Sequence, residues 1–183
     1  MGTPNKLFGQ DEISLAIDKI AEKIALEFLI GDKQDDFVLV GLFKQGVPLA
    51  ERICKVLQDK YNYFPEIARL DISMYRDDFG LRSALPIINE TIIPFDMHEA
   101  NVILVDDVLS TGRTIRAALD AVTDYGRPNL IRLAVLVDRN NSEYPIKADY
   151  IGFDIKCSDD YKVLVEFKEN DGIDLISEVS WKR

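Results

Sequence analysis

The chain has 183 residues, of which 47% are hydrophobic, and its 22 Lys and Arg against 32 Asp and Glu give a formal charge of −10. This length fits one domain with its own core, and the absence of a long apolar run or a signal-peptide core predicts a soluble cytoplasmic protein without a membrane span. Two cysteines and one histidine exclude a disulfide framework and a His-rich zinc site, and the acidic balance disfavours nucleic-acid binding.

The first half of the chain predicts a helix, a strand and a second helix. Apolar residues from Ile13 to Ile24 recur at helical spacing, with Asp11 or Ser14 as candidate caps and Gly31 as the end. Residues 37–43 are continuously apolar, which is typical of a strand buried on both faces. The next helix has Pro48 near its start and extends to about residue 60.

The second half predicts three more strands around a long loop and a helix. A strand is expected over residues 67–74, followed by a polar loop over 76–94 with room for a hairpin; loops this long are often functional. A strand over 101–105, a helix around 115–122 and a strand over 130–137 come next. Short β-like segments around 148–155 and 162–167 precede a polar tail.

This order of elements predicts an α/β fold with a parallel sheet and right-handed crossovers. Polar residues follow three of the predicted strands, at positions 44–46, 106–107 and 138–139. Ligands of such sheets bind outside the carboxyl ends of the strands, so we expect these three groups to face one crevice.

The segment 102–114 (Val-Ile-Leu-Val-Asp-Asp-Val-Leu-Ser-Thr-Gly-Arg-Thr) carries the strongest chemical signal. Four apolar residues lead into Asp106 and Asp107, which cost solvation free energy unless a cation or hydroxyl groups offset them. The small residues after them enter a helix, whose first N–H groups form an anion cradle. Carboxylates for hydroxyls beside an anion cradle indicate a site for a phosphorylated sugar; the alternative is a capped turn with solvated acids.

This segment resembles the phosphoribosyl-diphosphate (PRPP) motif of type I phosphoribosyltransferases. The stretches 75–78, 126–128, 133–139 and 145–152 resemble one branch, the bifunctional pyrimidine operon regulators and uracil phosphoribosyltransferases (PyrR), and the similarity spans about residues 11–176. The resemblance implies a type I phosphoribosyltransferase fold, with a twisted parallel sheet, helices on both faces and a small hood. It also implies a single domain over 1–183, a lid loop about 76–94, a hood from the N-terminal and 139–183 segments, and a homo-oligomer.

The reaction of this family converts uracil and PRPP to UMP and pyrophosphate, with Mg²⁺ bridging pyrophosphate and ribose oxygens. By resemblance, Asp106 and Asp107 hold the ribose hydroxyls, favour a developing cation and affect the metal only indirectly. Arg76 is assigned to catalysis at the start of the lid; a surface ion pair with Asp77 or Asp78 is the alternative. The implied PRPP-binding residues are Lys44, Gln45, Gly46, Val108, Leu109, Ser110, Thr111, Gly112, Arg113 and Thr114.

Residues 44–46 occupy the pyrophosphate loop, where relatives often have Thr-Arg-Gly, and Lys44 would supply a point charge in place of the arginine fork. A strained or cis peptide is typical of this loop in the family, so we expect one within residues 43–45.

The base-binding residues implied by the resemblance are Asp138, Arg139, Phe153 and Ile155. Purine-specific relatives carry a third acid where this chain has Ser110 and a lysine where it has Asp138. A carboxylate would repel the 6-oxo oxygen of a purine, so uracil is the expected base, and Phe153 either covers the ring or packs in the core. A hypoxanthine or guanine phosphoribosyltransferase remains the alternative enzyme.

Regulators of this branch bind messenger RNA on a basic face, and three features of that face are missing. Asp18 and Glu22 replace Thr and His, residues 140–142 lack the usual His and Arg, and Phe153-Asp154 replaces a basic stretch. Acidic side chains repel RNA phosphates, so we expect RNA attenuation to be weak or lost. A UMP-sensing RNA-binding regulator of pyrimidine genes is the alternative from another functional class.

Overall fold

The computed structural model describes residues 4–30, 34–76, 89–158 and 160–180. Its central sheet is parallel, with the strand order β3-β2-β4-β5-β6. These strands are β3 (Ile67–Leu70), β2 (Val38–Leu42), β4 (Asn101–Leu109), β5 (Leu130–Asp138) and β6 (Tyr150–Asp154). Because all five are parallel, their carboxyl ends meet along one edge of the sheet, as the sequence predicted.

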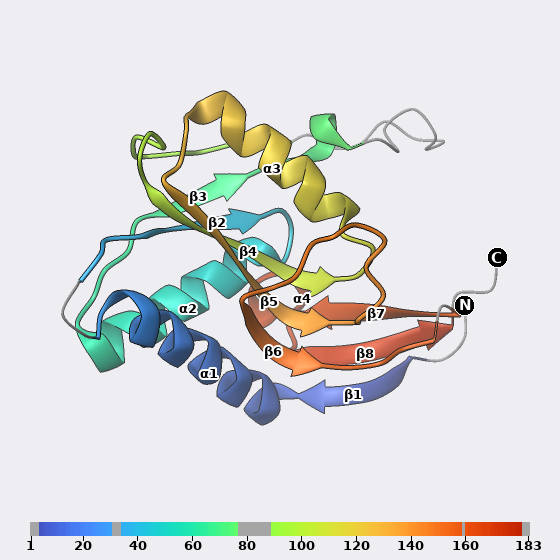
Figure 1. Ribbon diagram of the computed structural model, residues 1–183. Helices are drawn as coiled ribbons and strands as arrows, with labels where there is room; N and C mark the ends of the chain where they lie inside the picture. Colours follow the sequence, from blue (N-terminus) through green and yellow to red (C-terminus); the bar gives the residue numbers. More distant parts are fainter. Residues whose placement is uncertain (1–3, 31–33, 77–88, 159, 181–183) are drawn as a thin grey trace.

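Helices cover both faces of this sheet (Figure 1). The helices α1 (Gln10–Phe28) and α2 (Gly46–Tyr61) pack on one face and α3 (Arg113–Tyr125) on the other. Strand β4 shows why both faces need a cover, because Ile103 and Val105 lie in the core beneath α1 and α2, while Val102 and Leu104 lie in the core beneath α3. The predicted α/β architecture is therefore confirmed. None of the described helices is long and apolar enough to cross a membrane.

A small antiparallel sheet, called the hood below, lies beside the carboxyl ends of the central strands (Figure 1). It has the order β1-β8-β7, with β1 (Asn5–Gly9), β8 (Leu175–Ser180) and β7 (Tyr161–Glu166), and the short helix α4 (Lys168–Asp171) connects β7 to β8. The sequence did not predict β1 or β8. Both strands are short, and long-range contacts stabilise them: β8 pairs with β1 and β7, Ile176 is buried, and Phe8 of β1 stacks on Phe153.

Several predicted boundaries were wrong for local reasons. Helix α1 is capped neither by Asp11 nor by Ser14, because its N-cap residue is Gly9, whose N–H donates to Glu12 Oε2 at 2.9 Å as in one half of a capping box. The strand expected over 67–74 ends at Leu70, and a turn of 3₁₀ helix, η1 (Ser73–Tyr75), follows. Residues 77–88, most of the expected lid, lie outside the described residues.

Candidate functional site

The two adjacent carboxylates lie inside strand β4 and not after its end. The sequence placed the end of this strand at residue 105, but the ladder with β5 continues from Asp106 opposite Val135 to Leu109 opposite Asp138. The Asp106 side chain is 4% exposed, whereas Asp107 is half-buried. The pairing of β4 with β5 therefore continues through the acid pair and fixes its backbone.

Burial changes the protonation of this pair. Loss of hydration raises the pKa of Asp106 well above its usual range, the charge of Asp107 raises it further, and Arg76 only partly opposes this. Burial also raises the pKa of Asp107, against the lowering effects of nearby hydrogen-bond donors and of Lys162 on β7. Two carboxylates this close cannot both ionise easily, so the free protein retains a proton on Asp106 above the usual range of an aspartate. A cation or hydroxyl donors at this point would favour the ionised pair.

Arg76 lies at the entrance to the same region. Its Nη1 donates to Thr114 Oγ1 at 3.0 Å, which joins the residue after η1 to the first turn of α3. The carbonyl of Tyr75 also accepts from Arg116 Nη2 at 3.4 Å, and the Tyr75 hydroxyl donates to Asp124 at 2.7 Å. Arg76 is thus held beside the acid pair by contacts with α3, and its partners include a residue of the expected phosphate site.

The turn between β4 and α3 has the shape of an anion cradle. Gly112 has φ of +88°, and a Cβ there would meet Tyr144 Cβ at 3.2 Å, so this tight approach requires glycine. The carbonyl of Thr111 accepts from the N–H groups of Glu143 and Tyr144 at 2.9 and 3.2 Å. The loop after β5 therefore buttresses residues 110–112 at the start of α3, where the first N–H groups of a helix can bind an anion.

The loop before α2 forms the third side of the site. The peptide bond Phe43–Lys44 is cis, as expected for this loop. Gly46 starts α2 so close to β4 that a Cβ would lie 2.3 Å from the Val105 carbonyl oxygen. Lys44 is exposed, so its ammonium group is available to an anion beside the acid pair.

The four residues assigned to the base lie in different environments. Asp138 lines a cavity of about 700 Å³, together with Lys147 and Ile151 among others. The buried Arg139 guanidinium donates to Ser110 Oγ at 3.2 Å and to the Ser158 and Tyr161 carbonyls at 3.3 and 2.8 Å.

Phe153 and Ile155 complete the set of assigned base residues. Phe153 stacks on Phe8 with ring centroids 3.9 Å apart, and the Ile155 N–H donates to the Asp138 carbonyl at 2.9 Å. Asp138 thus borders open space, whereas Arg139 and one face of Phe153 are engaged by the protein itself.

The chemistry of the acid pair also indicates which metal ion suits the site. In the described part of the chain, no three His, Cys, Asp or Glu side chains gather as a ready-made metal site. Asp106 and Asp107 offer carboxylate oxygens, which suit Mg²⁺, an ion that keeps several waters and often binds through substrate phosphates. The buried, partly protonated pair therefore fits an Mg²⁺ ion that arrives with a phosphorylated ligand.

Sequence reasoning did not assign Asn170 and Asp171 to this region, although both contact the loop before α2. Asn170 Nδ2 donates to Gln45 Oε1 at 2.9 Å, and Asp171 Oδ2 accepts from Gln45 Nε2 at 2.7 Å. The two residues lie more than 120 positions from Gln45 in a four-residue helix of polar residues. No periodicity or local motif signals such a contact, which depends on the folding of the hood.

Comparisons with known proteins agree with this geometry. The model of the phosphoribosyl transferase domain matches residues 6–171. The chain is 44% identical over 178 residues to the bifunctional protein PyrR of Chloroflexus aurantiacus, covering 95% of this chain and 94% of the relative. It is also 44% identical to the bifunctional protein PyrR of Deinococcus radiodurans, with 93% and 91% of the two chains covered.

Solved structures agree in fold at low sequence identity. A hypoxanthine-guanine phosphoribosyltransferase from Bacillus anthracis has a TM-score of 0.72 at 17% identity, covering 96% of this chain and 98% of that one. The hypoxanthine phosphoribosyltransferase of Trypanosoma cruzi has a TM-score of 0.71 at 18% identity, covering 97% of each chain. At these identities the likeness supports the fold alone.

Proposed function

Because the chain belongs to the phosphoribosyl transferase domain family and, within it, to the PyrR branch, we propose that it transfers the 5-phosphoribosyl group of PRPP to uracil, giving UMP and pyrophosphate. The observation that carries the proposal is the pair of the buried Asp106 and the half-buried Asp107 on β4, directly before the turn that opens α3. Carboxylates for a ribose and N–H groups for its 5′-phosphate thus follow each other within one segment of the chain.

The reaction breaks the bond from ribose C1 to pyrophosphate and forms a bond from C1 to the base nitrogen. Positive charge develops on the ribose as the first bond loosens, and Asp106 and Asp107 stabilise that charge while holding the 2′- and 3′-hydroxyls. Residues 110–114 bind the 5′-phosphate, and Lys44 with the N–H groups of Gly46 and Val47 bind pyrophosphate. Holding these parts in line converts an encounter of separate reactants into a step within one complex.

A magnesium ion bound with PRPP would supply charge neutralisation for the departing pyrophosphate. Asp106 and Asp107 would hold it indirectly, through ribose oxygens and water. Arg76, which is tied to Thr114, adds a positive charge that acts on Asp106.

Asp138 supports a pyrimidine as the second substrate. It lies at the end of β5, and it lines a cavity large enough for a base. A carboxylate there accepts a hydrogen bond from a ring N–H, and it stands where purine-specific relatives carry a lysine for the 6-oxo oxygen, so a purine would lack that cationic partner. Uracil offers such an N–H group between its two carbonyl oxygens.

We expect pyrophosphate release from PRPP and Mg²⁺ with uracil, and little release with hypoxanthine, guanine or orotate. The expected preference for uracil is at least 100-fold in kcat/KM, because an unpaired or repelled polar group in a base pocket costs about 3 kcal/mol. A coupled assay for pyrophosphate measures all four bases on one preparation. Turnover with hypoxanthine alone would show that the substrate base is a purine and not uracil. No turnover with any base would refute the proposal that this protein is a phosphoribosyltransferase enzyme.

Within this branch, we propose that binding of messenger RNA is weak. The exposed face of α1 carries Glu22 and the half-buried Asp18, which is paired with Lys60 at 3.0 Å. Arg113, a cation beside residues 140–142, is paired with Glu143 at 2.8 Å. A gel-shift assay with the leader of the pyrimidine genes from the same genome, with and without UMP, is expected to show dissociation constants above about 1 μM. UMP-dependent nanomolar binding would contradict this expectation.

A further inference from the structure

The hood and the loop before α2 share a set of hydrogen bonds that substrate binding does not explain. Gln45 Nε2 donates to the Val165 carbonyl at 3.1 Å and to Asp171 Oδ2 at 2.7 Å, and Gln45 Oε1 accepts from Asn170 Nδ2 at 2.9 Å. These bonds use both amide protons of Gln45. The side chain is therefore committed to the hood, and Gln45 contributes to an anion site through its backbone.

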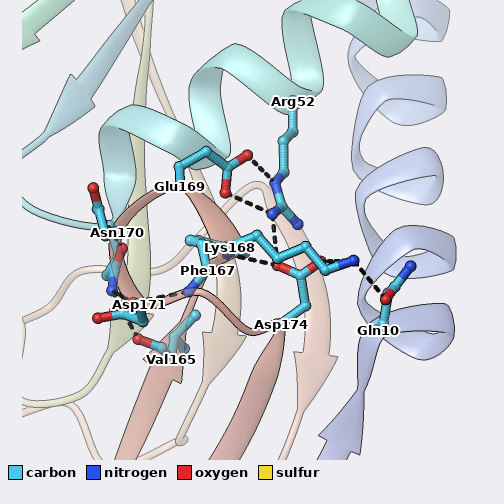
Figure 2. A network of polar contacts seen from close by, with 10 residues as sticks. Gln10, Arg52, Val165, Phe167, Lys168, Glu169, Asn170, Asp171 and Asp174 are labelled. Carbon is cyan, nitrogen blue, oxygen red and sulfur yellow. Dashed lines mark hydrogen bonds and ion pairs between the residues drawn. The ribbon is translucent and has the colours of Figure 1, made fainter.

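A separate set of contacts fixes α4 on α2 (Figure 2). Arg52 of α2 contacts Glu169 at 2.7 Å and the buried Asp174 at 2.6 Å, and its guanidinium lies 4.5 Å from the centroid of the buried Phe167 ring. Lys168 Nζ also donates to Gln10 Oε1 at 2.7 Å. Helix α4 is thus anchored without Gln45, and it presents Asn170 and Asp171 from a fixed base.

Among the described residues, the loop borders open space on this side. A cavity of about 490 Å³ lies against it, lined by Phe43, Lys44 and Gln45 and by Asn170 and Asp171 among others. The Gln45 carbonyl accepts from the Leu49 N–H at 3.2 Å, so the position of Gln45 also sets the first turn of α2. Fixing the Gln45 side chain therefore fixes the neighbouring Lys44 and the N–H groups of Gly46 and Val47 as one unit.

We propose that Asn170 and Asp171 are positioning residues for pyrophosphate: through Gln45 they hold the pyrophosphate loop, residues 43–46, in its binding conformation. The inference rests on the proposed function, because it gives the hood a role in placing the leaving group. It assigns the hood a part in PRPP affinity although neither residue touches the substrate. Only the pyrophosphate end of the substrate depends on this contact, and the base end does not.

The proposal is tested by exchanging donor and acceptor in the hydrogen bond between Gln45 and Asp171. Gln45→Glu places a carboxylate against Asp171 and is expected to raise the KM values of PRPP and of pyrophosphate in the reverse reaction about tenfold, leaving the KM of uracil within about twofold. The double variant Gln45→Glu with Asp171→Asn has the wild-type net charge and restores a donor and an acceptor between the two positions. The Val165 carbonyl and the Phe167 N–H group lose their wild-type partners in it, so the KM values for PRPP and pyrophosphate are expected to recover only part of the way toward wild type.

Glu169→Gln is the matched control, because Glu169 lies in α4 beside Asn170 and Asp171 but does not contact Gln45. The substitution weakens the ion pair between Glu169 and Arg52 of α2. It is expected to lower the unfolding temperature without changing the KM of pyrophosphate. Equal KM values in Gln45→Glu and wild type, or no recovery in the double variant, would overturn the proposal.

Hydrogen exchange at the amides of residues 44–47 and of Leu49 provides a readout that needs no turnover. It is expected to be faster in Gln45→Glu and slow again in the double variant. Unchanged exchange refutes the positioning role. If the variants show the expected exchange pattern but the wild-type protein does not turn over uracil, only the proposed reaction is refuted.

Discussion

Replacing Asp107 by Asn is expected to lower kcat for UMP formation by about 100- to 1000-fold, the loss typical when one preorganised group that stabilises developing charge is removed. The amide retains the shape of the side chain and one acceptor oxygen, but not the charge that stabilises positive charge on the ribose. The KM of PRPP is expected to change much less, because the 5′-phosphate and pyrophosphate contacts remain. Steady-state kinetics with saturating Mg²⁺ separates the two parameters.

The stability of this variant provides its control. Burial raises the pKa of Asp107 in the folded protein above the ordinary value of 3.8, so the unfolded chain loses its proton first as the pH rises. The free energy of unfolding therefore falls with pH between the two pKa values, and Asp107 costs stability at pH 7. Asp107→Asn removes that cost, so its unfolding temperature at pH 7 should equal or exceed that of wild type. Lost activity with a lowered unfolding temperature, or unchanged turnover, would contradict the assigned role.

Replacing Gly46 by Ala is expected to affect both the fold and the site. The new Cβ would lie 2.3 Å from the Val105 carbonyl oxygen, and that atom belongs to the backbone of a central strand, which cannot move aside. The start of α2 must shift instead, at a cost of about 1–3 kcal/mol in the free energy of unfolding. The shift also separates the pyrophosphate loop from the acid pair, so kcat/KM for PRPP should fall at least 100-fold.

Thermal unfolding and kinetics on the same preparation measure both effects of Gly46→Ala. Lys55→Ala, at an exposed position of α2, is the matched control and should leave both values close to wild type. A Gly46→Ala protein with wild-type stability and wild-type PRPP affinity would show that α2 does not approach β4 as closely as the structure has it.

Local patterns were sufficient to predict the central sheet, and they also underlie the prediction of the sugar-phosphate part of the site. The apolar run 102–105, the acid pair and the Ser110–Gly112 turn are contiguous, so one segment specifies strand, carboxylates and cradle together. The strands β2, β4 and β5 are likewise buried on both faces, and continuous apolar runs identify such strands. The cis peptide bond was anticipated from resemblance, since no local signal at Phe43 indicates it.

The hood could not be predicted in the same way. Strands β1 and β8 are separated by more than 160 residues, and neither has a turn or an alternation strong enough to indicate a pairing. Gln45 was assigned to PRPP from its place in the loop, whereas its side chain is held by Asn170 and Asp171. Arg139 likewise follows a strand end but donates to the carbonyls of Ser158 and Tyr161, at the start of β7. Such long-range polar contacts depend on the finished fold and leave no periodicity in the sequence.

The conversion of isotopically labelled uracil tests the central claim most directly. The protein is incubated with labelled uracil, PRPP and Mg²⁺, and both UMP and pyrophosphate are quantified. The proposed reaction predicts that label passes into UMP with one pyrophosphate released for each UMP, and that Asp107→Asn under the same conditions forms almost none. Labelled uracil that stays unchanged while PRPP remains intact would contradict the assignment of this chain as a uracil phosphoribosyltransferase.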